Sequence, residues 1–173
     1  KPYSITQNAS LMSFIPEKFN TSGADGAYFK PAKGKQNRVR ILCNEPLLGF
    51  VQWTTDKRPA RWALDQRAPD LDFQQDTKPR KFIAVTVWNY EAERIQVWEI
   101  TQRTLQDTLS ALGKDEDFGH PMNYDLKISR KGEGLETSYS MVPIPCNMSE
   151  EVKTARLVDI KLEALLTSGD PFA

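Results

Sequence analysis

Two groups of side chains in this 173-residue sequence could carry chemistry, and the first is a run of acids. Asp115-Glu116-Asp117 shortly precedes His120, the single histidine of the chain. Carboxylates and an imidazole together can hold a divalent ion and activate water for hydrolysis. Consecutive residues rarely converge on one ion, however, and this run lies between a predicted helix end and Pro121. We therefore interpret it as a solvated loop.

No other pattern in the sequence predicts catalysis. The chain lacks a glycine-rich phosphate loop with Lys-Ser/Thr, and no set of Ser, His and Asp has a suggestive spacing. Cys43, Cys146 and His120 do not have the spacing of a zinc site. We expect a non-enzymatic protein with no catalytic residue, metal or cofactor. A metal-dependent nuclease is the least favoured alternative.

The second group is a basic stretch that contains tryptophans. Residues 27–81 hold 12 basic and 6 acidic residues, so they carry +6, while the rest of the chain carries −6 and the whole chain is neutral. Such a polarised charge suits a polyanion at one face of the molecule. Trp53 and Trp62 lie inside the stretch, and Trp88 and Tyr90 follow it. The competing interpretation is a solvated loop rich in Lys and Arg.

The basic stretch is predicted to contain a bent strand and a long loop. Arg38 and Arg40 alternate with apolar residues over 37–42, which is the period of a half-buried strand. After a short break the extended pattern resumes over 48–54, so we expect one long, bent strand. Residues 55–79 contain three prolines and many charges, and they exceed the length of an ordinary connection. They form the candidate binding loop.

The segments 81–90 and 95–100 are rich in β-branched and aromatic residues and are predicted to pair as a hairpin. Directly opposed residues share a face of the sheet. On this basis Trp98 is assigned to the core, whereas Trp88 and Tyr90 are expected to be exposed. The register behind this assignment pairs Tyr90 with Ile95, Trp88 with Val97, Val87 with Trp98, and Val85 with Ile100.

A helix, a second hairpin and a last helix follow. Leucines recur at helical spacing after Thr101, a candidate N-cap, and Gly113 offers a stop. Residues 124–130 and 136–142 flank a Lys-Gly-Glu-Gly turn and predict the second hairpin. A helix is predicted from the cap Ser149 to about Leu166.

This order of elements predicts a mainly β fold. It is that of a five-stranded OB-fold barrel with a helix between strands 3 and 4, a long loop between strands 1 and 2, and a C-terminal helix. Such barrels bind oligonucleotides on strands 2 and 3 and on the flanking loops. The expected organisation is an N-terminal arm (1–26), an OB-fold nucleic-acid-binding domain (27–147), and a C-terminal helix and tail (148–173). A different small α+β or sandwich fold is the alternative.

Exposed aromatic rings beside cations suit single-stranded nucleic acid, because every base offers a π-face for stacking while cations follow the phosphates. A duplex hides those faces. The stacking candidates are Trp88 and Tyr90, with Trp53 or Trp62 as aromatic residues of the loop region. The phosphate candidates are Lys57, Arg58, Arg61, Lys78, Arg80 and Lys81, together with Arg38 and Arg40 on the first strand. Core packing is the alternative for each aromatic residue.

Several short segments together resemble a known family. They are Arg38-Val39-Arg40-Ile41-Leu42, Gly49 to Trp53, Lys57-Arg58-Pro59-Ala60-Arg61, Val87-Trp88-Asn89-Tyr90 with Trp98-Glu99-Ile100-Thr101, and Tyr124-Asp125-Leu126 before Gly132-Glu133-Gly134. Over roughly 27–145 the chain resembles bacteriophage single-stranded-DNA-binding proteins with an OB fold. The resemblance implies binding with low sequence specificity that protects exposed strands during phage DNA replication and recombination.

The chain departs from that family in two respects. Some phage members carry a zinc cluster, for which this chain has no ligands, and many end in a strongly acidic tail that recruits replication proteins. Here the last six residues contain one acid, in an Asp-Pro-Phe sequence similar to the tip of bacterial single-strand-binding proteins.

Several partners and one alternative function follow from these patterns. Single-stranded DNA is the expected partner, and RNA, replication or recombination proteins, and self-association through the arm or the last helix are left open. The two cysteines fit the reducing cytoplasm of a host cell, with a Cys43–Cys146 bridge as the alternative, and no apolar run reaches membrane-spanning length. The main alternative function is a phage structural or interaction protein that uses an OB-like barrel for assembly.

Overall fold

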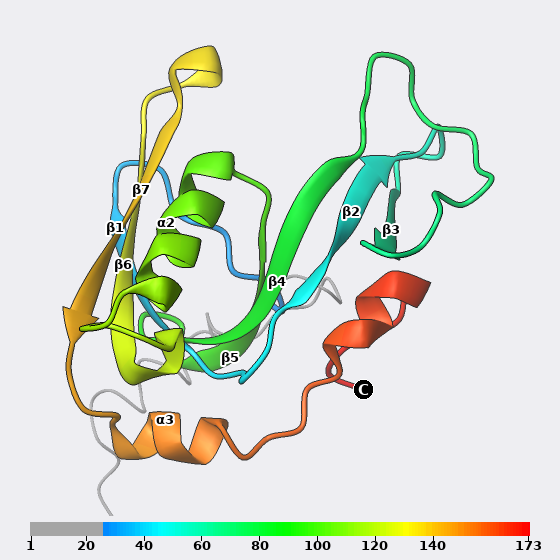
Figure 1. The fold of residues 1–173 in the computed structure, drawn as a ribbon. Coiled ribbons are helices and arrows are strands. Elements are labelled where there is room, and N and C mark those ends of the chain that lie inside the picture. Colours follow the sequence, from blue (N-terminus) through cyan, green and yellow to red (C-terminus); the bar gives the residue numbers. More distant parts are fainter. Residues whose placement is uncertain (1–25) are drawn as a thin grey trace, which may run out of the picture.

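The structure is a computed structural model that describes residues 26–173, so the predicted arm lies almost wholly outside the described residues. Within them the protein is mainly β, with seven strands in one antiparallel sheet (Figure 1). The strands are β1 (Gln36–Ile41), β2 (Leu47–Trp53), β3 (Pro59–Ala63), β4 (Arg80–Asn89), β5 (Arg94–Ile100), β6 (Tyr124–Lys131) and β7 (Ser138–Pro145). The helices are α2 (Arg103–Lys114) and α3 (Glu150–Ala155), with short 3-10 helices η1 (Pro121–Asn123), η2 (Gly134–Glu136) and η3 (Leu162–Thr167).

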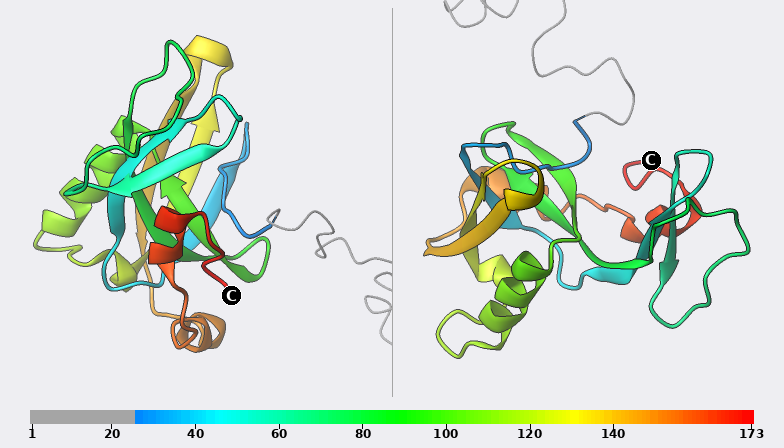
Figure 2. Two further views of the ribbon diagram at one scale, coloured as in Figure 1. Left: turned by 90° about the vertical axis from the view of Figure 1, so that its right-hand side faces the viewer. Right: turned by 90° about the horizontal axis from the view of Figure 1, so that it is seen from above.

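The long strand β4 organises the sheet. One side of β4 pairs with β1 and with β2, which follow each other along it, and the other side pairs with β5. Strand β3 extends the sheet beyond β2, while β6 and β7 extend it beyond β1, which gives the order β3-β2-β4-β1-β6-β7. The sheet is open and strongly bent, so that its β2–β3 end leans away from the part formed by β1, β6 and β7 (Figure 2).

Seven strands replace the five predicted from the sequence. The expected single bent strand is divided into β1 and β2, although the two keep a common partner in β4. The expected loop 55–79 contains β3, which pairs with β2 and leaves residues 64–79 as the loop proper. Pro59 begins β3, and proline is tolerated there because β3 lies at the edge of the sheet.

The β4–β5 hairpin keeps the predicted faces but not the predicted register. Val85 pairs with Trp98 and Trp88 pairs with Ile95, because the turn begins one residue earlier than expected. The Asn89 side chain sets this turn, since its Oδ1 accepts hydrogen bonds from the two backbone amides at 91 and 92. The register differs by two residues, which preserves the alternation of faces. The burial predicted for Trp98 is therefore confirmed, with 1% of its surface exposed.

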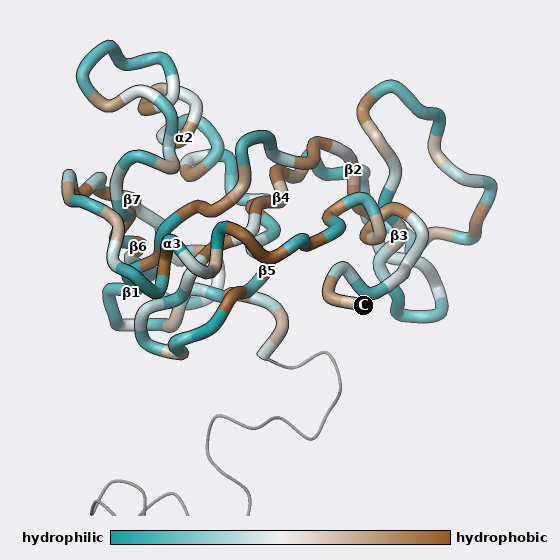
Figure 3. Tube along the Cα trace, turned by 90° about the horizontal axis from the view of Figure 1, so that it is seen from below, coloured by the Kyte–Doolittle hydropathy of each residue, from teal (hydrophilic) through white to brown (hydrophobic). Residues whose placement is uncertain are grey.

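The main core lies between the inner face of the sheet and α2. Leu105 and Leu109 of the helix pack there against Trp98 and the aliphatic residues of the central strands. The hydropathy colouring changes between hydrophobic and hydrophilic along these strands, because only one face of each lies in this core (Figure 3). The predicted helix is confirmed, but Gln102 and not Thr101 is its N-cap, and it runs one residue past Gly113. Among residues 26–173, no helix combines the length and apolar character that crossing a membrane requires.

The second predicted hairpin is confirmed as β6 and β7, with a longer second strand. Strand β7 continues through Pro143 to Pro145, where the sequence predicts a stop. Prolines are accommodated because β7 is the last strand in the sheet order and leaves one edge unpaired. The turn requires glycine at Gly132, whose φ is 82° and where an added Cβ would lie 2.3 Å from the carbonyl oxygen of Glu136.

The C-terminal segment, residues 149–173, forms two short helices and not the single helix predicted. Ser149 caps α3 as predicted, since its Oγ accepts a hydrogen bond from the amide of Val152. Helix α3 ends at Ala155, and η3 begins at Leu162. The apolar residues of α3 pack beside Trp88, whereas those of η3 pack on another patch of the bent sheet. One straight helix could not follow both patches.

Candidate nucleic-acid interface

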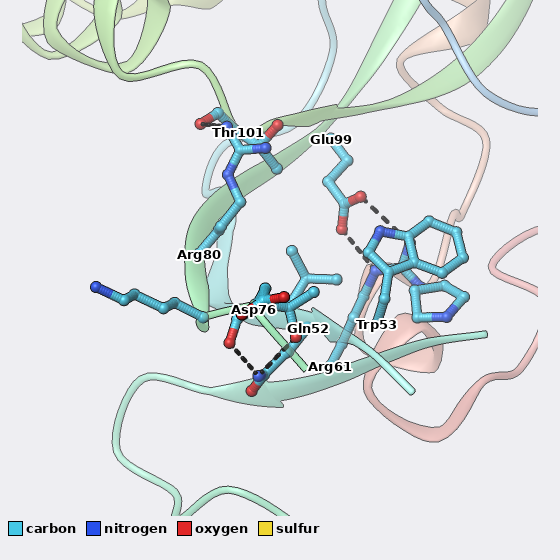
Figure 4. A pocket seen from close by; sticks show the side chains of 11 residues that line it. Gln52, Trp53, Arg61, Asp76, Arg80, Glu99 and Thr101 are labelled. Carbon is cyan, nitrogen blue, oxygen red and sulfur yellow. Dashed lines mark hydrogen bonds and ion pairs between the residues drawn. The ribbon is translucent and has the colours of Figure 1, made fainter. Parts of the chain in front are cut away.

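A groove of about 550 Å³ opens where the β2–β3 hairpin meets the ends of β4 and β5 (Figure 4). Strand pairing places much of its lining on one face of the sheet. Trp53 lies opposite Pro59, and Val51 pairs with Arg61 on one side and with Arg80 on the other. We call this face, which points away from the main core, the outer face. The volume falls in the usual range of ligand-binding pockets.

Four of the predicted nucleic-acid-binding residues line this groove, namely Trp53, Arg61, Lys78 and Arg80. Trp53 leaves 49% of its surface exposed, which is unusual for so large an apolar side chain. Lys57 and Arg58 are exposed in the turn between β2 and β3, which joins Trp53 to its strand partner Pro59. The structure thus gathers one aromatic ring and several cations that are distant in sequence.

An ion pair closes one side of the groove. Arg61 Nε lies 2.5 Å from Glu99 Oε2, and Arg61 Nη2 lies 3.2 Å from Glu99 Oε1. Strands β3 and β5 are not neighbours in the sheet, so this pair depends on the bend that brings them together (Figure 4). Glu99 fixes the guanidinium and offsets its charge. Glu99 was not among the predicted site residues, because its pairing with Arg61 depends on this tertiary contact.

The loop 64–79 carries Lys78, leads into Arg80 at the start of β4, and is fixed to the β2–β3 hairpin by side-chain hydrogen bonds. Gln52 Nε2 donates hydrogen bonds to both Thr77 O and Thr77 Oγ1, each at 3.1 Å, which pins the residue before Lys78. Earlier in the loop, Gln74 Nε2 donates to the carbonyl oxygen of Thr54 at 2.9 Å. Within the described part of the chain, neither Lys78 nor Arg80 forms an ion pair. Both cations therefore remain available to an anionic ligand.

Two predicted site residues, Trp62 and Lys81, lie on the face of the sheet opposite to the outer face, away from the groove. Trp62 is 5% exposed and packs between Phe50 and Phe73, with ring centroids 5.9 and 6.0 Å away. The prediction that Trp62 could stack on a base is wrong, because the ring anchors the loop 64–79 to the sheet. Lys81 is exposed, but it follows Arg80 in a strand and pairs with Phe50, so it lies on the face away from the groove.

The other four predicted residues form a second region of the outer face, built around Asp125. This carboxylate accepts from Arg38 Nε at 2.7 Å, from Arg40 Nη1 at 3.1 Å and from the Tyr90 hydroxyl at 2.8 Å. Arg40 is 2% exposed, so its predicted role in binding phosphate is wrong. The pKa of the Tyr90 hydroxyl is raised, mainly by burial and secondly by its hydrogen bond to Asp125.

Trp88 and Tyr90 are half-buried, which corrects the prediction that both rings are exposed. They pack with Ile95 against Val152 and Ala155, so helix α3 covers this part of the sheet. The Arg38 guanidinium lies 5.6 Å from the centre of the Tyr90 ring, and its hydrogen bond to Asp125 raises its pKa. In the structure, therefore, these rings cannot stack on a base while α3 remains in place.

In the acidic run after α2 and at His120, side chains accept hydrogen bonds from nearby backbone amides. Asp115 Oδ1 accepts hydrogen bonds from the amides of Asp117 and Phe118, and His120 Nδ1 accepts from the amide of Met122. Over residues 26–173, no group of three or more His, Cys, Asp or Glu side chains is placed to hold a metal ion. Both cysteines are free thiols.

Comparisons of the chain with known protein families, with curated proteins and with solved structures find no match. The function is therefore inferred from the groove itself. It joins an exposed indole ring to Lys78 and Arg80, which form no ion pair with any of residues 26–173, although Arg80 Nη2 donates a hydrogen bond to Thr101 O at 3.4 Å.

Proposed function

We propose that the protein binds single-stranded DNA with low sequence specificity and that the groove holds part of the strand. The observation that carries this proposal is the exposed Trp53 in one groove with Lys78 and Arg80. A base stacks on the indole ring, which contributes about 1 to 3 kcal/mol and tolerates any base, while the cations bind phosphates. The resemblance to phage proteins supports a role in protecting exposed strands during DNA replication and recombination.

The strand connections support an OB fold as the finer architecture. If β1 and β2 together count as the first strand, then β4, β5, β6 and β7 are the second to fifth, and α2 lies between the third and the fourth. Strand β3 and the loop 64–79 then belong to the connection between the first and second strands. The groove lies on this connection and on the second strand, where OB folds bind oligonucleotides.

The salt dependence of binding tests the role of the two cations. Each phosphate contact with a single strand contributes about 0.7 to the slope of log K against log salt. We expect Arg80→Ala and Lys78→Ala each to lower that slope by about 0.7, measured by fluorescence anisotropy of a labelled oligothymidylate. Lys114→Ala, at the far end of α2, is the control and should keep the wild-type slope. Absence of wild-type binding at about 50 mM salt would overturn the proposal.

Breaking the Arg61–Glu99 pair should strengthen DNA binding, in contrast to the two cation variants. Glu99→Gln removes a negative charge from the groove and frees Arg61 for a phosphate, so we expect affinity for single-stranded DNA to rise about tenfold and the salt slope to increase by about 0.7. The same anisotropy titration measures both quantities. Glu116→Gln changes the charge equally at an exposed position after α2 and should have little effect. Equal gains in the two variants would show that net charge alone is responsible.

A further inference from the structure

The outer face continues well beyond the groove. Every second residue of β4 lies on it, so Arg80 at the groove is followed by Phe82, Ala84, Thr86 and Trp88. Strand β1 adds Arg38, whose side chain is 39% exposed, whereas Arg40, which pairs with Trp88, is buried and cannot reach a phosphate. One face therefore carries aromatic rings between Arg80 at one end and Arg38 at the other. This is the composition of a surface that stacks bases and follows phosphates.

Most of that face is covered by the chain itself. Val152 and Ala155 of α3 pack beside Trp88 and Tyr90, and Leu162 and Leu165 of η3 pack on Phe82. The groove is the part that the C-terminal segment leaves open. Two views show η3 against the β2–β3 end of the sheet and α3 at the opposite end (Figures 1 and 2).

The cover is built in a way that favours local opening. It consists of one six-residue α-helix and one six-residue 3-10 helix, and 3-10 helices have the poorer hydrogen-bond geometry. Their connection leaves Leu157 85% exposed and Val158 50% exposed. Short helices joined by an exposed connection open at lower free energy than the core of a domain. The segment also carries five acidic and three basic residues, so its net charge is negative. Phosphates bound nearby would repel it.

We propose that the covered part of the outer face, from Phe82 to Tyr90, is a second half of the single-stranded-DNA site and that the C-terminal segment competes with DNA for it. This inference rests on the proposed function, because the groove is the first half. A short strand occupies the groove alone. A longer strand displaces the segment and stacks on Phe82 and Trp88, so that bases replace the side chains of α3 and η3.

Variants that loosen the cover test this inference. Val152→Asp and Leu165→Asp place a charge at fully covered positions of α3 and η3, whereas Leu157→Asp makes the same change at an exposed position. We expect each of the first two variants to bind an oligothymidylate of about 16 nucleotides at least tenfold more tightly than wild type. Affinity for one of about 4 nucleotides should not change, and Leu157→Asp should match wild type with both. Adding Trp88→Ala to Val152→Asp should remove the gain.

Hydrogen exchange on the unaltered protein keeps the inference testable if the aspartate variants fail to fold. The longer oligonucleotide should speed exchange at the amides of α3 and η3, and the shorter one should not. Unchanged or slower exchange, or equal affinity of the folded variants and wild type for the longer strand, would overturn the competition while leaving the groove proposal intact. If wild type binds neither oligonucleotide, the proposed function itself fails.

Discussion

Replacing Asp125 by alanine should lower the free energy of unfolding by about 3 to 5 kcal/mol. Its carboxylate is 2% exposed and is the ion-pair partner of Arg40, whose side chain is equally buried. Without Asp125 the guanidinium of Arg40 keeps its charge inside the protein with no compensating anion. Arg38 and the Tyr90 hydroxyl lose a partner as well. Urea denaturation followed by circular dichroism measures the change.

Two control variants show whether the loss of stability comes from the charge of Asp125, from its volume, or from removing any ion-paired acid. Asp125→Asn keeps the side-chain volume but not the charge, so it should retain most of the loss in stability. Asp107→Ala removes an acid that faces Arg103 at 3.9 Å with both side chains largely exposed, and it should cost less than about 0.5 kcal/mol. Similar losses for Asp125→Ala and Asp107→Ala would show that the buried network contributes no more than a surface pair.

The faces of the β4–β5 hairpin could be predicted from the sequence because a register error of two residues preserves the alternation of side chains. The assignment of Trp98 to the core depends only on which face of the hairpin is apolar, and a difference of two residues leaves that face unchanged. The turn itself was missed because it depends on the Asn89 side chain capping two amides. Strand β3 was missed because it is short, begins at Pro59 and interrupts a segment rich in charge.

The covering of the outer face could not be predicted from local patterns. The apolar spacing of residues 149–166 indicates one amphipathic helix, but spacing does not say on which surface the helix packs. The bent sheet offers two separate apolar patches, and the chain divides its helix to cover both. Burial of Trp88 and Tyr90 follows from this tertiary contact, so their own sequence neighbourhoods carry no sign of it. Arg40 is buried by other distant groups, namely Asp125 and the carbonyl oxygens of Met122 and Cys146.

Trp53 and Trp62 are indistinguishable as binding candidates in the sequence. In the structure, however, removing Trp62 should mainly lower stability, whereas removing Trp53 should mainly lower affinity for DNA. Trp62→Ala should lower the free energy of unfolding by about 3 to 5 kcal/mol, because a buried aromatic side chain leaves a cavity beneath the loop 64–79. Trp53→Ala should change stability by less than about 1 kcal/mol, because about half of this ring is already in water. Its affinity for oligothymidylate should fall about tenfold through lost stacking, with an unchanged salt slope.

Denaturation and anisotropy titration on both variants decide between these roles, provided that binding is measured where Trp62→Ala is still folded. Under that condition any loss of affinity in Trp62→Ala comes from the loosened anchor of Lys78, since the ring lies on the face away from the groove. Such a loss should appear in the salt slope, because a misplaced cation makes fewer phosphate contacts. A Trp53→Ala variant that binds like wild type would remove the stacking role and leave the groove as an electrostatic site alone.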